Sequence, residues 1–228
     1  MMKKEVFHEA KRITRLLLMF FLIFIAYVLA ANGLLSTSVK NYASIDQDWN
    51  LILVNQDNYI PDDYDIELTV LSNGESVDSR IYANLQDMFD NARAAGIYPI
   101  VVSGFRTQEK QQSLLDDKIE AYNVEGHSKA EARKLAENWV AVPGTSEHQL
   151  GIAVDINADK SKSARNEVYS WLAKNAYYYG FILRYPSDKT DITGTIYEPW
   201  HYRFVGEDVA KEIYSKGICL EEYIDGLK

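Results

Sequence analysis

Apolar residues recur with two different periods along the chain, and the two periods predict a mixture of helices and short strands. Over residues 81–95 the apolar positions return every three or four residues, which predicts an amphipathic helix that stops at Gly96. The same criterion predicts further helices over residues 108–122, 128–139, 163–179 and 207–216. Short apolar runs between turn residues predict strands over residues 51–54, 67–71, 97–102, 151–156, 181–185 and 202–205.

These helices and strands follow one another in mixed order, without the regular alternation that builds a parallel sheet. The order predicts an α+β fold in which helices surround a small antiparallel sheet. Cys219 is the only cysteine, so no disulfide can form within the chain. The roughly 180 residues after position 48 are enough to bury a hydrophobic core without one.

The first 31 residues have a different character from the rest. Five basic residues precede an uncharged apolar run over 16–31, and residues 32–35 could extend that run to the length of a membrane span. Basic residues before such a run place the N-terminus inside and the rest of the chain outside. We therefore expect a signal-anchor over 1–31, a linker over 32–48 and a catalytic domain over 49–228. The pattern favours a retained single-pass anchor in the cell membrane over a cleaved signal peptide.

The charge of the chain limits the partners that it can have. The formal net charge is −9, and the acidic excess lies after the leader. An acidic domain is a poor partner for nucleic acid, so we expect none. Nothing in the composition predicts an oligomeric state.

Two histidines and an aspartate form a candidate zinc site. Asp155 interrupts the apolar run 151–156, where a carboxylate is costly unless it is paired or binds a metal. His148 precedes this run, and His201 lies in a second aromatic stretch with Glu198 three residues before it. Either histidine alone is more often a hydrogen-bonded interior residue. Together, each with its own acid, His148, Asp155 and His201 predict three zinc ligands with a fourth position open for water. Glu198 is then free to move that water's protons.

Three motifs resemble those of the VanY-type D-alanyl-D-alanine carboxypeptidases, which are zinc peptidases of peptidoglycan. They are Ser-Gly-Phe-Arg at 103–106, Ser-Glu-His-Gln-Leu-Gly-Ile-Ala-Val-Asp at 146–155, and Glu-Pro-Trp-His-Tyr-Arg at 198–203. The resemblance covers residues 51 to 205. The family more often carries tyrosine where this chain has Phe105, a change that removes a hydroxyl and keeps the arginine.

The resemblance implies roles for further residues. Arg106 would bind the substrate and stabilise the transition state, as suits a planar guanidinium opposite a carboxylate or an oxyanion. Gln111, Ser146 and Tyr185 match substrate-side positions of the family, and Trp200 would form a wall of the pocket. By pattern alone, Gln111 is a polar position on an exposed helix face.

The function implied by the resemblance is removal of the terminal D-alanine from peptidoglycan stem peptides or their precursors. An L,D-carboxypeptidase that acts on tetrapeptides carries the same motifs and stays open as an alternative. Two less favoured alternatives are an endopeptidase of the same fold and a wall-binding module that has lost catalysis.

Overall fold

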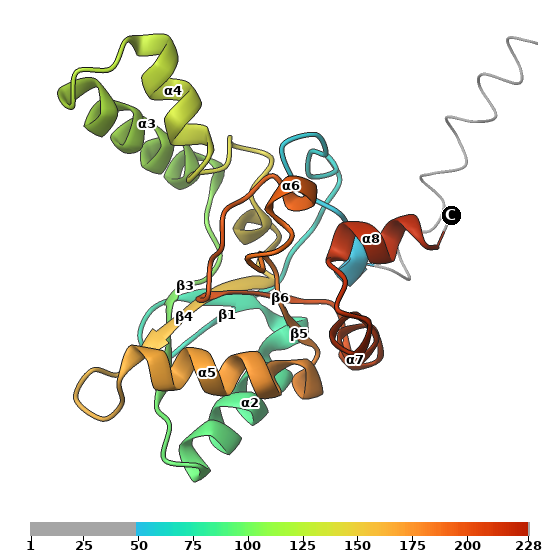
Figure 1. The fold of residues 1–228 in the computed structure, drawn as a ribbon. Helices are drawn as coiled ribbons and strands as arrows, with labels where there is room; N and C mark the ends of the chain where they lie inside the picture. Colours follow the sequence, from blue (N-terminus) through green and yellow to red (C-terminus); the bar gives the residue numbers. More distant parts are fainter. Residues whose placement is uncertain (1–48, 228) are drawn as a thin grey trace, which may run out of the picture. The chain divides into compact units, whose positions relative to one another are not determined.

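A four-stranded antiparallel sheet lies at the centre of the domain (Figure 1). The computed structural model describes residues 49–227. The sheet contains β3 (Pro99–Ser103), β4 (Ala153–Ala158), β5 (Phe181–Leu183) and β6 (His201–Phe204). Their order is β3-β4-β6-β5, and every neighbouring pair is antiparallel. The four strands that the sequence predicts over 97–102, 151–156, 181–185 and 202–205 thus form with slightly different ends, and the α+β prediction is confirmed.

The two faces of this sheet have opposite characters. Side chains alternate between the faces along a strand. In β4 the buried Val154 and Ile156 therefore point to one face and Asp155 points to the other. In β6, Tyr202 shares the apolar face, whereas His201 lies on the same face as Asp155. The polar face carries the site.

Helices α2 (Tyr82–Ala94) and α5 (Arg165–Asn175) lie on the apolar side of the sheet (Figure 1). The predicted face of α2 is confirmed, since its buried residues are Leu85, Met88, Phe89 and Ala92. The predicted helix 163–179 is divided, because α5 gives way to the 3-10 helix η4 (Ala176–Tyr179). Gly180 ends η4 with a φ of 82°, where an added Cβ would overlap the Phe204 ring.

On the polar side, a helical hairpin projects away from the sheet (Figure 1). It consists of α3 (Gln108–Val124) and α4 (Lys129–Glu137), and α4 begins with a capping box formed by Ser128 and Glu131. The short helices η3 (Glu147–Leu150) and α6 (Thr190–Thr193) lie on the same side. Helix α6 lies in a segment between β5 and β6 for which the sequence pattern predicts no helix or strand.

The predicted strand 51–54 is wrong. The 3-10 helix η1 (Trp49–Leu51) occupies the start of this run, and residues 52–54 follow without strand pairing. The carbonyl oxygens of Asn50 and Ile52 accept hydrogen bonds from the buried Arg203 guanidinium, at 3.1 and 2.9 Å, so they do not join a ladder. Leu51 and Leu53 instead pack against a core cluster that includes Ile182, Val205, Ala210, Ile213 and Leu220.

Two helices complete the C-terminal part of the domain. Helix α7 (Glu207–Lys216) has the predicted bounds, and α8 (Leu220–Asp225) follows in a tail for which the sequence pattern predicts nothing. Both contribute to the core cluster defined above. The C-terminal tail is therefore part of the packed domain.

A second, two-stranded sheet is formed by β1 (Leu68–Val70) and β2 (Ser76–Asp78), joined by the predicted Asn73–Gly74 turn. The 3-10 helix η2 (Ser79–Ile81) then leads into α2.

Residues 50–228 form one compact unit. The predicted leader and linker lie outside the described residues. Within 49–227, none of the helices combines the length and the apolar composition that a membrane span requires.

Candidate zinc centre and catalytic cleft

The three predicted zinc ligands come together on the polar face of the sheet. Asp155 and His201 are directly paired residues on the neighbouring strands β4 and β6. His148 lies on η3, and Gly151 turns the chain from η3 into β4 with a φ of 69°. One ligand atom of each side chain lies within 4.8 Å of the others.

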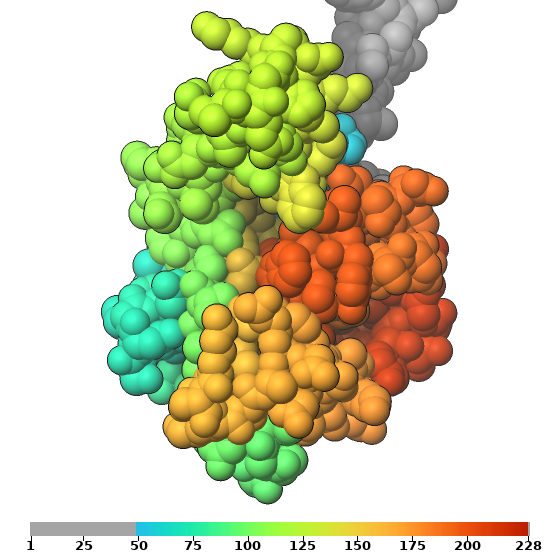
Figure 2. Space-filling model, turned by 60° about the vertical axis from the view of Figure 1, so that its left-hand side comes forward, coloured from blue at the N-terminus to red at the C-terminus, as the bar shows by residue number. Residues whose placement is uncertain are grey.

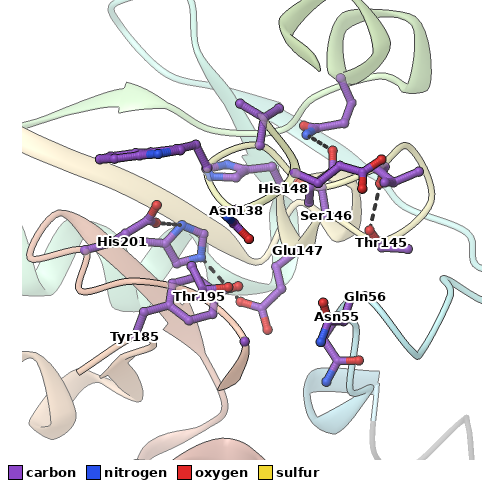
Figure 3. A pocket seen from close by; sticks show the side chains of 18 of the residues that line it. Asn55, Gln56, Asn138, Thr145, Ser146, Glu147, His148, Tyr185, Thr195 and His201 are labelled. Atoms are coloured by element: carbon purple, nitrogen blue, oxygen red, sulfur yellow. Dashed lines mark hydrogen bonds and ion pairs between the residues drawn. The ribbon is translucent and has the colours of Figure 1, made fainter. Parts of the chain in front are cut away.

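The hydrogen bonds of the two imidazole rings leave one nitrogen of each ring facing Asp155. His148 Nδ1 donates to the carbonyl oxygen of Gly104 at 2.8 Å, and Nε2 lies 3.3 Å from Asp155 Oδ1. The His201 ring is reversed, with Nδ1 3.1 Å from the same oxygen and Nε2 3.4 Å from Glu147 Oε2 (Figure 3). The second nitrogen of each ring therefore contacts a group outside the ligand set, which orients the ring.

These residues fit a zinc ion. Two imidazole nitrogens and one carboxylate oxygen are ordinary zinc ligands, and three protein ligands are typical of catalytic zinc sites. Burial alone would raise the pKa of Asp155, but His148 and His201 hold that pKa well below its ordinary value. Asp155 is therefore ionised at neutral pH and able to bind a cation.

The motif 103–106 positions an arginine beside the ligands. Gly104 is needed because an added Cβ would overlap the carbonyl oxygen of Ser76. Arg106 donates from Nε to Ser103 Oγ and from Nη2 to Asp155 Oδ2, both at 2.9 Å. Its Nη1 has only a long contact of 3.4 Å with Gln111 Oε1. Arg106 thus fixes the second oxygen of Asp155 and keeps Nη1 for a ligand in the cleft.

Glu198 lies close to the ligands but makes a looser contact than Asp155. Its Oε2 is 3.7 Å from His201 Nδ1. Burial and the negative charges of Asp155 and Glu147 raise the pKa of Glu198, against the lowering effects of His201 and Arg106. A carboxylate with a raised pKa is suited to accepting and returning a proton near neutral pH.

A cleft of about 500 Å³ contains all of these groups. The five predicted substrate-side residues line it as well, namely Arg106, Gln111, Ser146, Tyr185 and Trp200. The cleft is bounded on one side by the α3–α4 hairpin and on another by the segment around α6, and Figure 2 shows a hollow between them.

Gln111 departs from what its position in the helix pattern indicates. It is 1% exposed, and its Nε2 donates to the carbonyl oxygen of Ala141 at 2.7 Å. The prediction of an exposed face from pattern alone is therefore wrong at this residue. The family resemblance, which places Gln111 near the substrate, agrees with its location in the cleft.

A group of buried charges that the sequence does not predict lies next to His201, on the side of Nε2. We call Glu147, Arg184, Arg203 and Glu221 the buried ion cluster. Arg184 Nε and Arg203 Nη1 both donate to Glu147 Oε1, at 2.7 and 2.9 Å. Arg184 also donates to both oxygens of Glu221 on α8, at 2.9 and 2.6 Å. The available signal was a charge inside an apolar strand, because Arg203 interrupts β6 as Asp155 interrupts β4.

Comparisons with known proteins agree with this geometry. A protein-family model described as "VanY: D-alanyl-D-alanine carboxypeptidase" matches residues 74–207. A D-alanyl-D-alanine carboxypeptidase of Enterococcus faecalis is 61% identical over 180 residues, which make up 79% of this chain and 67% of that protein.

Two solved structures are similar over most of the described residues. One is a mutant of the vancomycin resistance D,D-pentapeptidase VanY, from a VanB-type resistance cassette, in complex with Zn(II). It is 61% identical, with a TM-score of 0.75, over 77% of this chain and 99% of that chain. The other is VanYB in complex with D-alanine-D-alanine, which is 60% identical with a TM-score of 0.77, over 79% of this chain and 99% of that chain. The residues matched by the family model include the four-stranded sheet and all three ligands, and the chain belongs to the VanY family of D-alanyl-D-alanine carboxypeptidases.

Proposed function

We propose that the chain is a zinc-dependent D-alanyl-D-alanine carboxypeptidase that removes the terminal D-alanine from peptidoglycan stem peptides. The observation that carries this proposal is the juxtaposition of His148, Asp155 and His201 with Glu198 in one cleft. The identity of 61% to a D-alanyl-D-alanine carboxypeptidase supports the D,D-specificity.

The side chains of the cleft divide the work of peptide hydrolysis. Zinc in such a site lowers the pKa of a water molecule to about 7 and polarises the carbonyl group under attack. Glu198 accepts the proton of the attacking water and then donates it to the leaving amine of D-alanine. Arg106 offers Nη1 to the substrate carboxylate or to the developing oxyanion, and one such donor typically contributes about 3–4 kcal/mol to catalysis.

Four further residues of the cleft, Gln111, Ser146, Tyr185 and Trp200, orient the substrate. Ser146 and Gln111 offer hydrogen-bonding groups beside Arg106, and Tyr185 and Trp200 supply apolar walls. The Tyr185 ring lies 4.9 Å from the His201 ring, centre to centre, so the wall reaches the metal ligands.

Mass spectrometry of muropeptides incubated with the described domain and zinc tests the proposal. Release of D-alanine from pentapeptides, with tetrapeptides left intact, is the expected result. Shortening of tetrapeptides would instead identify an L,D-carboxypeptidase, and internal cleavage would identify an endopeptidase. Binding of muropeptides without any cleavage would identify a binding module.

We further propose that the N-terminal segment holds the enzyme at the cell membrane with the domain outside. The basic residues before an apolar run support this topology. Protease added to cells without their wall should then digest the domain, and complete protection would exclude this topology. The mass of the mature protein reports whether residues 1–31 are retained.

A further inference from the structure

We propose that Glu147 is a positioning residue for His201, which it holds in the one tautomer that can bind the metal. The inference rests on the zinc site proposed above, and it concerns a residue that does not bind zinc itself. Figure 3 shows Glu147 beside the His201 ring, where its Oε2 lies 3.4 Å from Nε2, and Asp155 contacts the other ring nitrogen, Nδ1.

The first step of the argument concerns the two carboxylate oxygens of Glu147. Oε1 accepts hydrogen bonds from Arg184 and Arg203, and Oε2 lies 3.4 Å from His201 Nε2. An ionised carboxylate can only accept hydrogen bonds, so the proton of a neutral His201 ring must be on Nε2. Nδ1 then keeps its lone pair, and Nδ1 is the nitrogen that faces Asp155.

The second step concerns the charge of Glu147. Arg184 Nε and Arg203 Nη1 both donate to its Oε1, and a carboxylate that is paired with two guanidinium groups is ionised. An ionised Glu147 can only accept a hydrogen bond from His201. The two arginines and the two glutamates of the buried ion cluster balance in charge.

The third step concerns rigidity. The side chains of Glu147, Arg184 and Arg203 are completely buried. Arg184 is fixed in turn by Glu221 of α8, and Arg203 by the carbonyl oxygens of Asn50 and Ile52. The carboxylate of Glu147 is therefore fixed through Oε1 by two arginines that are themselves fixed, and this keeps Oε2 beside His201.

A purely structural role is the competing explanation, and Glu221 offers a matched control for it. Glu221 contacts the same Arg184, whereas the His201 ring contacts Asp155 and Glu147. Glu221→Gln and Glu147→Gln each remove one negative charge from the buried ion cluster. Only Glu147→Gln changes the group behind the metal ligand. Because the arginines require the amide oxygen, the amide NH₂ would face His201 Nε2 and favour the wrong tautomer.

The experiment is a titration of zinc into the metal-free variants in competition with a chelator. Groups that orient a metal ligand typically contribute about 10–100-fold to metal affinity. We expect Glu147→Gln to weaken zinc binding by about that factor and Glu221→Gln to change it by less than about threefold, at similar loss of melting temperature. Equal zinc affinities of the two variants would overturn the proposal.

A measurement on the unmodified protein covers the case in which Glu147→Gln does not fold. In the zinc-loaded domain labelled with ¹⁵N-histidine, NMR should show a slowly exchanging proton on His201 Nε2 and none on Nδ1. A proton on Nδ1 would overturn the proposal directly.

Discussion

The two sides of the His201 ring have opposite environments. On the cleft side, the side chains of Arg106, Asp155 and Glu198 are 19%, 14% and 12% exposed, and they keep hydrogen-bonding capacity for a metal and a substrate. On the other side, the side chains of Glu147, Arg184 and Arg203 are fully buried and each has charged partners. His201 thus lies between the charged groups of the cleft, which can still bind ligands, and the charged groups of the buried ion cluster, which are paired with one another.

This difference shows what each region contributes. A buried ion pair adds little net stability compared with apolar packing, but the loss of one partner is very costly. The buried ion cluster is therefore best understood as a rigid support, and the cleft charges as the reactive groups. The following predictions separate these two roles, from the largest expected effect to the smallest.

Replacing His201, which contacts both the cleft and the buried ion cluster, should abolish zinc binding and catalysis. We expect His201→Ala to lose bound zinc and D-alanine release together, down to the activity of the metal-free protein. Metal analysis and a D-alanine assay measure both. His127→Ala is the control, because His127 is exposed on the hairpin away from the ligands. A variant with full zinc occupancy and full turnover would remove His201 from the site.

Replacing Glu198 should reduce catalysis without reducing metal binding. Glu198→Gln keeps the shape of the side chain but cannot accept the proton, and general acid–base catalysis contributes about 10²–10⁴-fold. We expect kcat to fall by at least that range, while zinc content and affinity for a product peptide stay near the unmodified values. Release of zinc would instead make Glu198 a ligand and would make Asp155 the candidate base.

Breaking the buried ion cluster should reduce stability more than an exposed ion pair does. Arg184→Met leaves Glu147 and Glu221 without their shared partner, so we expect a loss of about 3–5 kcal/mol in the free energy of unfolding. Arg133→Met breaks the exposed pair with Glu137 and should cost less than about 1 kcal/mol. Urea denaturation of the two variants measures the difference. Equal losses in the free energy of unfolding would show that the buried ion cluster contributes no more to stability than an exposed ion pair.

The smallest expected effect is the release of a proton from His201 when zinc binds. Burial alone would lower the pKa of His201, but hydrogen bonds with Asp155 and Glu147 raise it to about 9 in the metal-free protein. The ligand must be neutral, so zinc binding at pH 7 should release close to one proton from His201, and less as the pH rises through 9. Zinc affinity should accordingly increase with pH up to about 9. Calorimetry in buffers of different ionisation enthalpy measures the release, and none at pH 7 would contradict the assignment.

Sequence reasoning found the parts of the molecule whose signal is local. The buried face of α2 follows from helical spacing alone. Asp155 and the two histidines stand out because few residue types bind zinc and because a charge inside an apolar strand needs a reason. The α+β architecture follows from the order of the elements, and their ends differ by a few residues.

The features that sequence reasoning missed depend on contacts between distant segments. The run 51–54 has the composition of a strand, but its backbone carbonyls are taken by Arg203 from far along the chain. Gln111 lies on a polar helix, and only the approach of Ala141 buries it. Glu147 is adjacent to His148 in the motif, yet its partners Arg184 and Arg203 lie directly after β5 and in β6, and no local pattern joins them.

The location of Glu221 in the last helix has a consequence for how the protein is made. Until α8 has been synthesised, Arg184 lacks the second of its two carboxylate partners, and a core cluster that includes Leu220 is incomplete. Chains grow from the N-terminus, and domains usually fold as units during synthesis. The support behind the metal ligand is therefore complete only after Glu221 has been synthesised, so a chain that is truncated before residue 221 would contain every catalytic residue and still lack part of that support.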